Sequence, residues 1–192
     1  MYRVVLVVSL LFLSACASET EQLAPTPVRA EPQPSATSLQ DGLAVRYYYG
    51  TFDHIRDLEG FMQYKDGKEG SALEVLRHEM GKGRVLTSES DDLVGAFITG
   101  YLHLEETGIY HFQVTNNDGV RLQLGGARIY DDPRTGPART SPPIPVDVME
   151  PGWYALEIWY FEKRGTATLD ILWSPPGDGD FIEVPITAMK HQ

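Results

Sequence analysis

Residues 94–124 read VGAFITGYLHL (94–104), EETG (105–108), IYHFQVT (109–115), NNDG (116–119) and VRLQL (120–124). Apolar side chains recur at every second position in the three longer runs, which is the period of a half-buried β-strand. Gly100 interrupts the apolar row of the first run and predicts a β-bulge. The two short runs carry residues typical of turns. The stretch therefore predicts three consecutive strands, and a hairpin at the first turn would place His103 opposite His111.

The same pattern continues toward the C-terminus. Gly125-Gly126 is a two-residue hairpin signal that leads into a strand over 127–130. Residues 131–145 hold five prolines and one glycine, and they predict an exposed loop or a weakly ordered crossing. A short strand over 146–148 and two longer alternating strands, near 154–160 and 167–173, follow.

Toward the N-terminus, Leu43 to Tyr49 alternates like the central strands. Ser71-Ala-Leu-Glu74 has the form of a capping box, and Gly81 is a suitable helix end, so the sequence predicts its one helix over 71–80. Short strands separated by turn residues predict an all-β fold, an antiparallel barrel or sandwich with at most one short helix.

The composition and charge of the chain disfavour several classes of partner and site. The chain has 192 residues, a formal net charge of −11 and a single cysteine. This acidic balance disfavours nucleic acid as a partner, because phosphates are repelled. A single cysteine allows neither an internal disulfide nor a cysteine-based zinc site.

The first residues predict export. Arg3 precedes a short apolar run that ends in Leu13-Ser-Ala-Cys16. The run is too short to span a bilayer and indicates a signal peptide over 1–15. The Leu-Ser-Ala-Cys order resembles the lipobox of bacterial lipoproteins, which implies acylation of Cys16. With Ala17 rather than Asp in the next position, the resemblance implies an outer-membrane lipoprotein of the cell envelope.

Ordinary cleavage after Ala17 is the alternative, because Ala15-Cys16-Ala17 also satisfies the small-x-small pattern. In either case residues 17–40 contain no aromatic residue and four prolines, and they predict a disordered tether. The predicted organisation is a signal peptide (1–15), a lipidated cysteine with a Pro-rich tether (16–40), and one β domain (41–192).

The central motifs resemble the PA14 domain family. The matching residues are Phe97, Gly100-Tyr101-Leu102, Thr107-Gly108-Ile109-Tyr110-His111-Phe112, Asn117-Asp118-Gly119-Val120-Arg121-Leu122, Gly125-Gly126, Asp131-Asp132, Pro151-Gly152-Trp153-Tyr154 and Leu169-Asp170-Ile171-Leu172-Trp173. The resemblance covers about residues 41–177. It implies a PA14-like β domain and a binding module rather than an enzyme.

Several adhesin members of that family bind sugars through a calcium ion held by two consecutive aspartates. The matching pair here is Asn117-Asp118, so the resemblance implies calcium as a cofactor at these two residues, with glycans or cell-surface ligands as partners. Arg121, Asp131 and Asp132 complete the predicted ligand-binding set. The alternative is that Asn117-Asp118-Gly119 is an ordinary turn whose side chains bond to local backbone amides.

No catalytic motif is apparent. The sequence contains neither an HExxH motif nor a Gly-x-Ser-x-Gly elbow, and no acid–base pair can be placed, so we expect no catalytic residues. Trp153, Trp159 and Phe161 share one strand face, which predicts either a sugar-stacking platform or burial against a second layer. The function expected is noncatalytic binding of carbohydrate at the envelope, and the alternative is an envelope scaffold that binds a protein partner of unknown identity.

Overall fold

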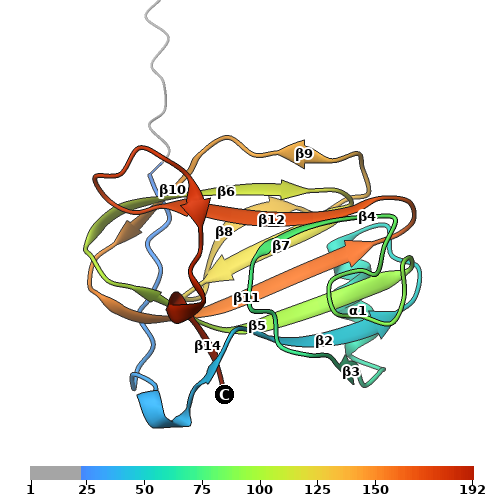
Figure 1. The fold of residues 1–192 in the computed structure, drawn as a ribbon, viewed down its shortest axis with the longest axis horizontal. Helices are drawn as coiled ribbons and strands as arrows, with labels where there is room; N and C mark the ends of the chain where they lie inside the picture. The colour runs from blue at the N-terminus through green and yellow to red at the C-terminus, as the bar shows by residue number, and fades with distance from the viewer. Residues whose placement is uncertain (1–22) are drawn as a thin grey trace, which may run out of the picture.

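The computed structural model describes residues 23–192. Two antiparallel sheets stack face to face with the apolar core between them (Figure 1). The first sheet contains β1 (Gln40–Asp41), β2 (Ala44–Tyr49), β3 (Lys68–Glu69), β5 (Val94–Leu104), β7 (Gly119–Leu124), β8 (Ala127–Asp132), β11 (Gly152–Glu162) and β14 (Met189–His191). The second contains β4 (Arg77–Gly81), β6 (Gly108–Asn116), β9 (Arg139–Thr140), β10 (Ile144–Val148), β12 (Ala167–Ser174) and β13 (Ile182–Glu183).

The predicted all-β sandwich is confirmed, and the sheets do not close into a barrel. The first sheet has the order β1-β14-β5-β11-β7-β8, with β2 on β5 and β3 on β2. The second has the order β10-β6-β12-β13, with β4 on β12 and β9 on β6. The apolar members of the alternating rows face the core, which is why strands with a period of two build this fold.

Gly100 does not mark a bulge, so that prediction is wrong. β5 pairs with β11 without interruption, and Gly100 lies opposite Leu156. A Cβ at Gly100 would collide with the carbonyl oxygen of Lys190 in β14. The glycine therefore permits close approach of a neighbouring backbone rather than an extra residue in the strand.

Chain turns at 105–107 and 117–118 are present, but neither is a hairpin. β5 and β7 belong to the first sheet and β6 lies between them in sequence but in the second sheet, so both turns cross from one sheet to the other. His103 and His111 consequently do not face each other across a hairpin. The hairpin at Gly125-Gly126 is confirmed, and both glycines have positive φ (+51° and +75°) between β7 and β8.

The predicted helix over 71–80 is wrong. Arg77–Gly81 forms β4, which pairs with β12, and the α-helix of the described residues is instead α1 (Ile55–Met62), with short 3-10 turns at η1 (Ala36–Ser38) and η2 (Ile186–Ala188). Pairing with an open sheet edge outweighs the local capping signal. No helix in residues 23–192 is long and apolar enough to cross a membrane.

The region 131–145 contains more strand than predicted. β8 continues through Asp132, β9 pairs with β6, and β10 begins at Ile144. The predicted short strand at 146–148 is confirmed as the end of β10.

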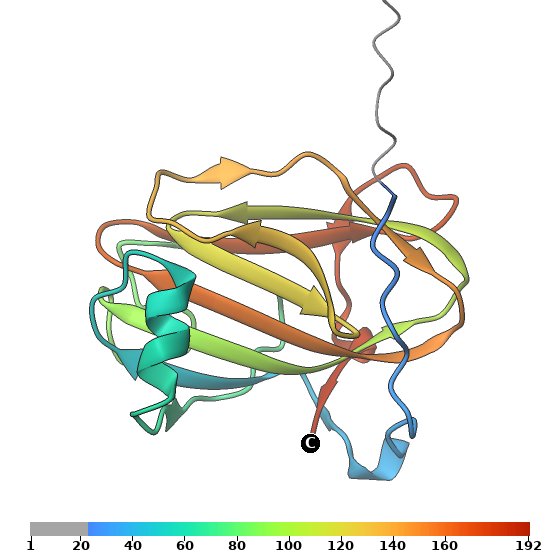
Figure 2. The ribbon, with the colours of Figure 1, turned by 180° about the vertical axis from the view of Figure 1, so that it is seen from behind.

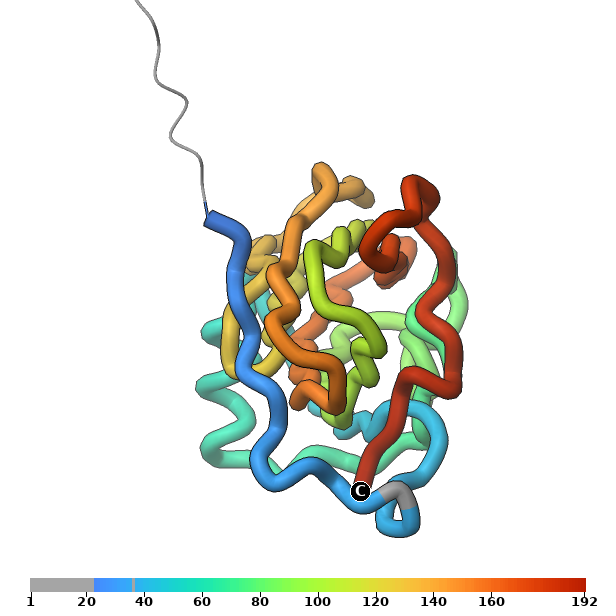
Figure 3. Tube along the Cα trace, turned by 90° about the vertical axis from the view of Figure 1, so that its left-hand side faces the viewer, coloured from blue at the N-terminus to red at the C-terminus, as the bar shows by residue number. Residues whose placement is uncertain are grey.

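The expected disorder of residues 17–40 is wrong for residues 23–40, the part that the structure describes. Residues 23–33, which we call the strap, run extended along the side of the sandwich (Figures 2 and 3). The amides of Val28 and Ala30 donate to the carbonyls of Gly125 and Trp153 at 3.0 and 2.9 Å. Pro27 is buried. The strap is ordered because β11 has a free edge beyond the point where β7 ends.

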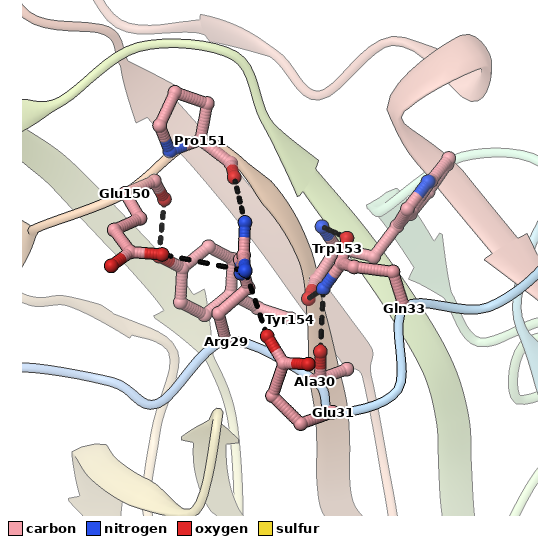
Figure 4. Close-up of polar contacts among 8 residues, drawn as sticks. All are labelled: Arg29, Ala30, Glu31, Gln33, Glu150, Pro151, Trp153 and Tyr154. Atoms are coloured by element: carbon pink, nitrogen blue, oxygen red, sulfur yellow. Dashed lines mark hydrogen bonds and ion pairs between the residues drawn. The ribbon is translucent and has the colours of Figure 1, made fainter.

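Side chains reinforce the docking of the strap (Figure 4). The Gln33 amide donates to the Trp153 carbonyl at 3.1 Å, and its oxygen accepts from the Trp153 amide at 2.8 Å. Arg29 donates to the Pro151 carbonyl at 3.3 Å and lies 3.4 Å from a Glu150 carboxylate oxygen. The Asp147 amide of β10 donates to the Pro25 carbonyl at 2.9 Å. The strap therefore contacts strands of both sheets. Cys16 lies outside the described residues.

Candidate functional site

The predicted Asn117-Asp118 site lies at one end of the sandwich, where three connections cross between the sheets. These are residues 117–118, residues 133–138 and residues 163–166, which join β6 to β7, β8 to β9 and β11 to β12. Asp118 has a positive φ of 47°, which lets the chain turn sharply there. Both side chains are buried, with 5% and 7% of their surfaces exposed for Asn117 and Asp118.

Asn117 makes hydrogen bonds with every part of its amide group. Its nitrogen donates to a carboxylate oxygen of Glu162 at 2.7 Å and to the carbonyl of Thr166. Its oxygen accepts from the Tyr160 hydroxyl at 3.1 Å and from the Thr168 amide at 2.8 Å. Burial holds the pKa of Tyr160 well above its usual value, so the phenol stays a donor. Asn117 thus fastens the crossing at 117–118 to the one at 163–166.

The Asp118 side chain joins the third crossing, residues 133–138, to the other two. One carboxylate oxygen accepts from the Gly136 amide at 3.1 Å, and the other accepts from the Lys163 amide at 2.7 Å. The Asp118 amide in turn donates to the Gly136 carbonyl at 3.0 Å. Its side chain thereby supplies acceptors for one part-buried backbone amide in each of the two other crossing segments.

Glu162 is fully buried beside this pair, and the sequence analysis did not select it as a site residue. Its second carboxylate oxygen has no hydrogen-bond partner within the described residues. Burial, with the neighbouring Asp118 charge adding to it, raises the pKa of Glu162 to about 7, although the Asn117 hydrogen bond opposes the shift. The group can hold a proton near neutral pH.

These contacts do not fit the predicted calcium pair. Both lone pairs of the Asn117 oxygen are used by protein donors, and the Asp118 oxygens face backbone amides. Calcium requires six to eight oxygen ligands. In residues 23–192 no group of three or more His, Cys, Asp or Glu side chains is arranged to hold a metal ion. The alternative drawn from the sequence is correct in that backbone amides bind these side chains, but the amides are not local: they belong to Gly136, Lys163 and Thr168, 18 to 51 positions away in the chain.

The other predicted ligand residues also have protein partners. Arg121 is 2.5 Å from Glu59 of α1 and 3.0 Å from Asp131 of β8. Asp132 pairs with Arg139 and accepts from Asn116 at 3.2 Å. The two ion pairs of Arg121 raise its pKa against the opposing effect of burial, which is the largest influence. The structure does not gather Arg121, Asp131 and Asp132 with Asn117 around an open space. Arg121 and Asp131 tie β7, β8 and α1 together, and Asp132 links β8 to β6 and β9.

An open space lies instead on the outer face of the first sheet. A hollow of about 380 Å³ covers β2 and β5, and a second of about 250 Å³ continues over β5 and β11. Both are lined by Ala44, Thr99, His191 and Gln192, so they form one depression, which we call the trough. Its other lining side chains include Arg46, Glu69, Phe97, Tyr101, Ala155 and Glu157.

The trough is bounded along β11. At one end α1 covers Phe161, which is fully buried, and packs against Trp159. At the other end the strap pairs with Trp153. Ala155, between them, is exposed, and Glu157 is half-buried. Figure 2 shows this face of the sheet between α1 and the strap. Of the three aromatic residues considered for a platform, Phe161 is core, and Trp153 and Trp159 are partly covered.

The sequence analysis did not select the trough residues. The signal was available, because Phe97 and Tyr101 alternate with the buried row of β5 and must point away from the core.

Comparison with known proteins identifies the fold family. The model of the PA14 domain matches residues 39–185. The chain belongs to the PA14 domain family.

Solved PA14 structures share this fold at low sequence identity. The PA14 domain of an antifreeze protein, MpAFP, superimposes with a TM-score of 0.66 at 17% identity, covering 84% of this chain and 96% of that one. The PA14 sugar-binding domain of an RTX adhesin gives 0.62 at 18% identity, covering 79% and 99%. Epithelial Adhesin 9 A domain from Candida glabrata, in complex with Galβ1-3GlcNAc, gives 0.63 at 11%, covering 88% and 96%.

One curated relative contains a similar segment. A β-hexosaminidase of Porphyromonas gingivalis is 31% identical over 104 residues, which are 50% of this chain but 13% of the enzyme. The PA14 domain described here therefore spans a small part of that relative. The structural neighbours are mostly binding or adhesin domains.

Proposed function

We propose that this PA14 domain is a noncatalytic carbohydrate-binding module that is held at the cell envelope and binds glycans or other cell-surface ligands. The observation that supports it most directly is membership of the PA14 family, in which the neighbouring structures include a sugar-binding adhesin domain and an adhesin in complex with Galβ1-3GlcNAc. An open trough with aromatic and polar lining is consistent with such a role.

The envelope position rests on the N-terminal sequence. Leu13-Ser-Ala-Cys16 supports acylation of Cys16 and attachment to the outer membrane. Mass spectrometry of the mature N-terminus tests this part: a diacylated cysteine is expected, and an unmodified N-terminal Ser18 contradicts it.

The binding function is tested by presenting the full chain to a broad glycan array, in buffers with calcium and with EGTA. We expect retained binding of at least one glycan in both buffers, because Asn117 and Asp118 are engaged by protein donors. Binding that disappears in EGTA would restore calcium to the function. Absence of binding in both buffers would overturn the carbohydrate proposal, and a stoichiometric protein captured from membranes by cross-linking would then support the scaffold alternative.

A further inference from the structure

The trough is built from rows of outward side chains that cross neighbouring strands in register. One row pairs Arg46 with Phe97 and Phe97 with Trp159. The rings of Phe97 and Trp159 lie 4.9 Å apart at 36°. The next row pairs Ala44 with Thr99 and Thr99 with Glu157. The row after it pairs Tyr101 with Ala155.

These rows combine large and small side chains. Ala44 and Ala155 fill little space, and the half-exposed Phe97 and Tyr101 flank them. The resulting hollow over β2 and β5, about 380 Å³, falls within the range of small-molecule sites. It continues from β2 to β11, two strand spacings or roughly 10 Å, which exceeds the length of one sugar ring.

The polar groups of the trough are of a mixed kind. Thr99 and Tyr101 offer hydroxyls that donate and accept, and Glu157 offers a carboxylate that only accepts. Arg46 also lines the trough, but its positive charge is already neutralised, because it pairs with Glu69 at 2.7 Å. The Glu157 carboxylate, at the β11 end of the trough in a chain of net charge −11, repels anionic ligands. Hydroxyl-rich, uncharged ligands with apolar ring faces complement this surface.

We propose that the trough across β2, β5 and β11 binds a neutral oligosaccharide without calcium, with Phe97 and Tyr101 contacting sugar rings and Glu157 accepting hydrogen bonds from sugar hydroxyls. The inference rests on the carbohydrate-binding function proposed above and places that function away from the Asn117-Asp118 corner. It also assigns the ligand class.

The test begins with a neutral glycan that the array identifies, titrated by calorimetry against the full chain in EGTA. Glu157→Ala and Tyr101→Ala are each expected to weaken binding by tenfold or more. Glu183→Ala and Tyr64→Ala are the matched controls, since both residues are exposed and lie outside the trough lining, and both should leave the affinity unchanged. Thermal unfolding of each variant checks that it folds.

A second measurement covers variants that fail to fold. On titration of the same glycan, amide NMR signals of residues 97–101 and 155–157 of the unmodified chain should shift, and those of residues 116–118 should not. Bound glycan with unaffected trough variants, or with shifts confined to 116–118, overturns the location and leaves the proposed function intact. Binding of acidic glycans alone overturns the ligand class. No glycan binding by the unmodified chain overturns both proposals.

Discussion

Asp118 and Glu162 show how single carboxylates can serve opposite purposes within one buried corner. Asp118 has both oxygens occupied by backbone amides, whereas one oxygen of Glu162 has no partner in the described chain. A buried acceptor that pairs with donors stabilises the fold, and one without a partner costs free energy when it is charged. The two residues therefore predict different responses to substitution.

Asp118→Ala should strongly destabilise the domain. The substitution leaves the part-buried amides of Gly136 and Lys163 without their acceptors, at a cost of about 1–2 kcal/mol for each. Denaturant unfolding should show a loss of roughly 2–4 kcal/mol, with or without calcium. Asp180→Ala, at an exposed position, is the control and should change the unfolding free energy little. An Asp118→Ala domain as stable as the unmodified one would contradict the structural role.

Glu162→Gln should remove a pH dependence. The pKa of Glu162 rises from its ordinary 4.5 to about 7 on folding. A raised folded pKa means that the group's contribution is fully present below about pH 4.5 and is lost as pH rises toward 7. The variant should therefore match the unmodified domain near pH 4 and exceed it by on the order of 3 kcal/mol above pH 7.

Urea unfolding at pH 4, 5.5 and 7.5 measures this difference. Glu157→Gln, which alters an outward carboxylate on the same strand, is the control. A stability difference that is constant with pH would contradict a protonated Glu162.

Among the elements, α1 is held to the sheet by both apolar packing and charge. Ile55 and Leu58 are fully buried, and Phe52 and Phe161 belong to the same small cluster. Arg121 then links Glu59 of the helix to Asp131 of β8. Its side chain is only 9% exposed, so this ion pair is less screened by solvent than a surface pair.

Arg121→Ala should loosen α1 while leaving the sandwich folded. We expect a loss of about 2 kcal/mol, since two carboxylates lose a charged hydrogen-bond donor. Hydrogen exchange should accelerate in residues 55–62 more than in β5 or β11. Arg128→Ala is the matched control, because Arg128 also contacts Asp131 but is half-exposed. Uniform acceleration over the whole domain would contradict a local role.

Strand positions could be predicted from sequence because their period is local, and the rows of β5, β6 and β7 follow it. The sequence could not show which of the two sheets a strand joins, since a turn within one sheet and a crossing between two sheets use the same residue types. The predicted helix over 71–80 is wrong because the capping box at Ser71 is a local signal, whereas β12, with which β4 pairs, is remote in sequence.

The candidate site was only partly predictable for a related reason. Asn117, Asp118 and Gly119 are equally suited to a cation and to a buried turn, and only the distant residues Tyr160, Glu162 and Lys163 distinguish the two. The trough depends on three strands that are far apart in the chain. Its one local sign was aromatic residues on the outward side of β5.

For the molecule as a whole, the strap joins the two sheets at their open side. It contacts β10 through Pro25 and β11 through Ala30 and Gln33. Residues that the sequence assigned to a tether thus form part of the folded domain.

Gln33→Ala should release the strap. The substitution removes three hydrogen bonds, two of them to the backbone of Trp153. Amide exchange at Val28 and Ala30 should accelerate at least tenfold, with a loss of about 1–2 kcal/mol in unfolding free energy. Thr26→Ala, an exposed change in the same segment, is the control. Unchanged exchange at both amides would show that the strap is held by other contacts.

The docked strap also sets how the molecule stands on a bilayer. With an acyl group on Cys16, seven residues separate the lipid from Leu23, a reach of at most about 25 Å in a fully stretched chain. Leu23 lies beside the prolines that precede β10, and the trough adjoins His191 and Gln192 at the C-terminus. The start of the strap and the C-terminus lie on opposite sides of the domain (Figures 1 and 2). If Cys16 is acylated as proposed, so short a connection would hold the Leu23 side of the domain near the lipid headgroups, with the trough on the side away from them.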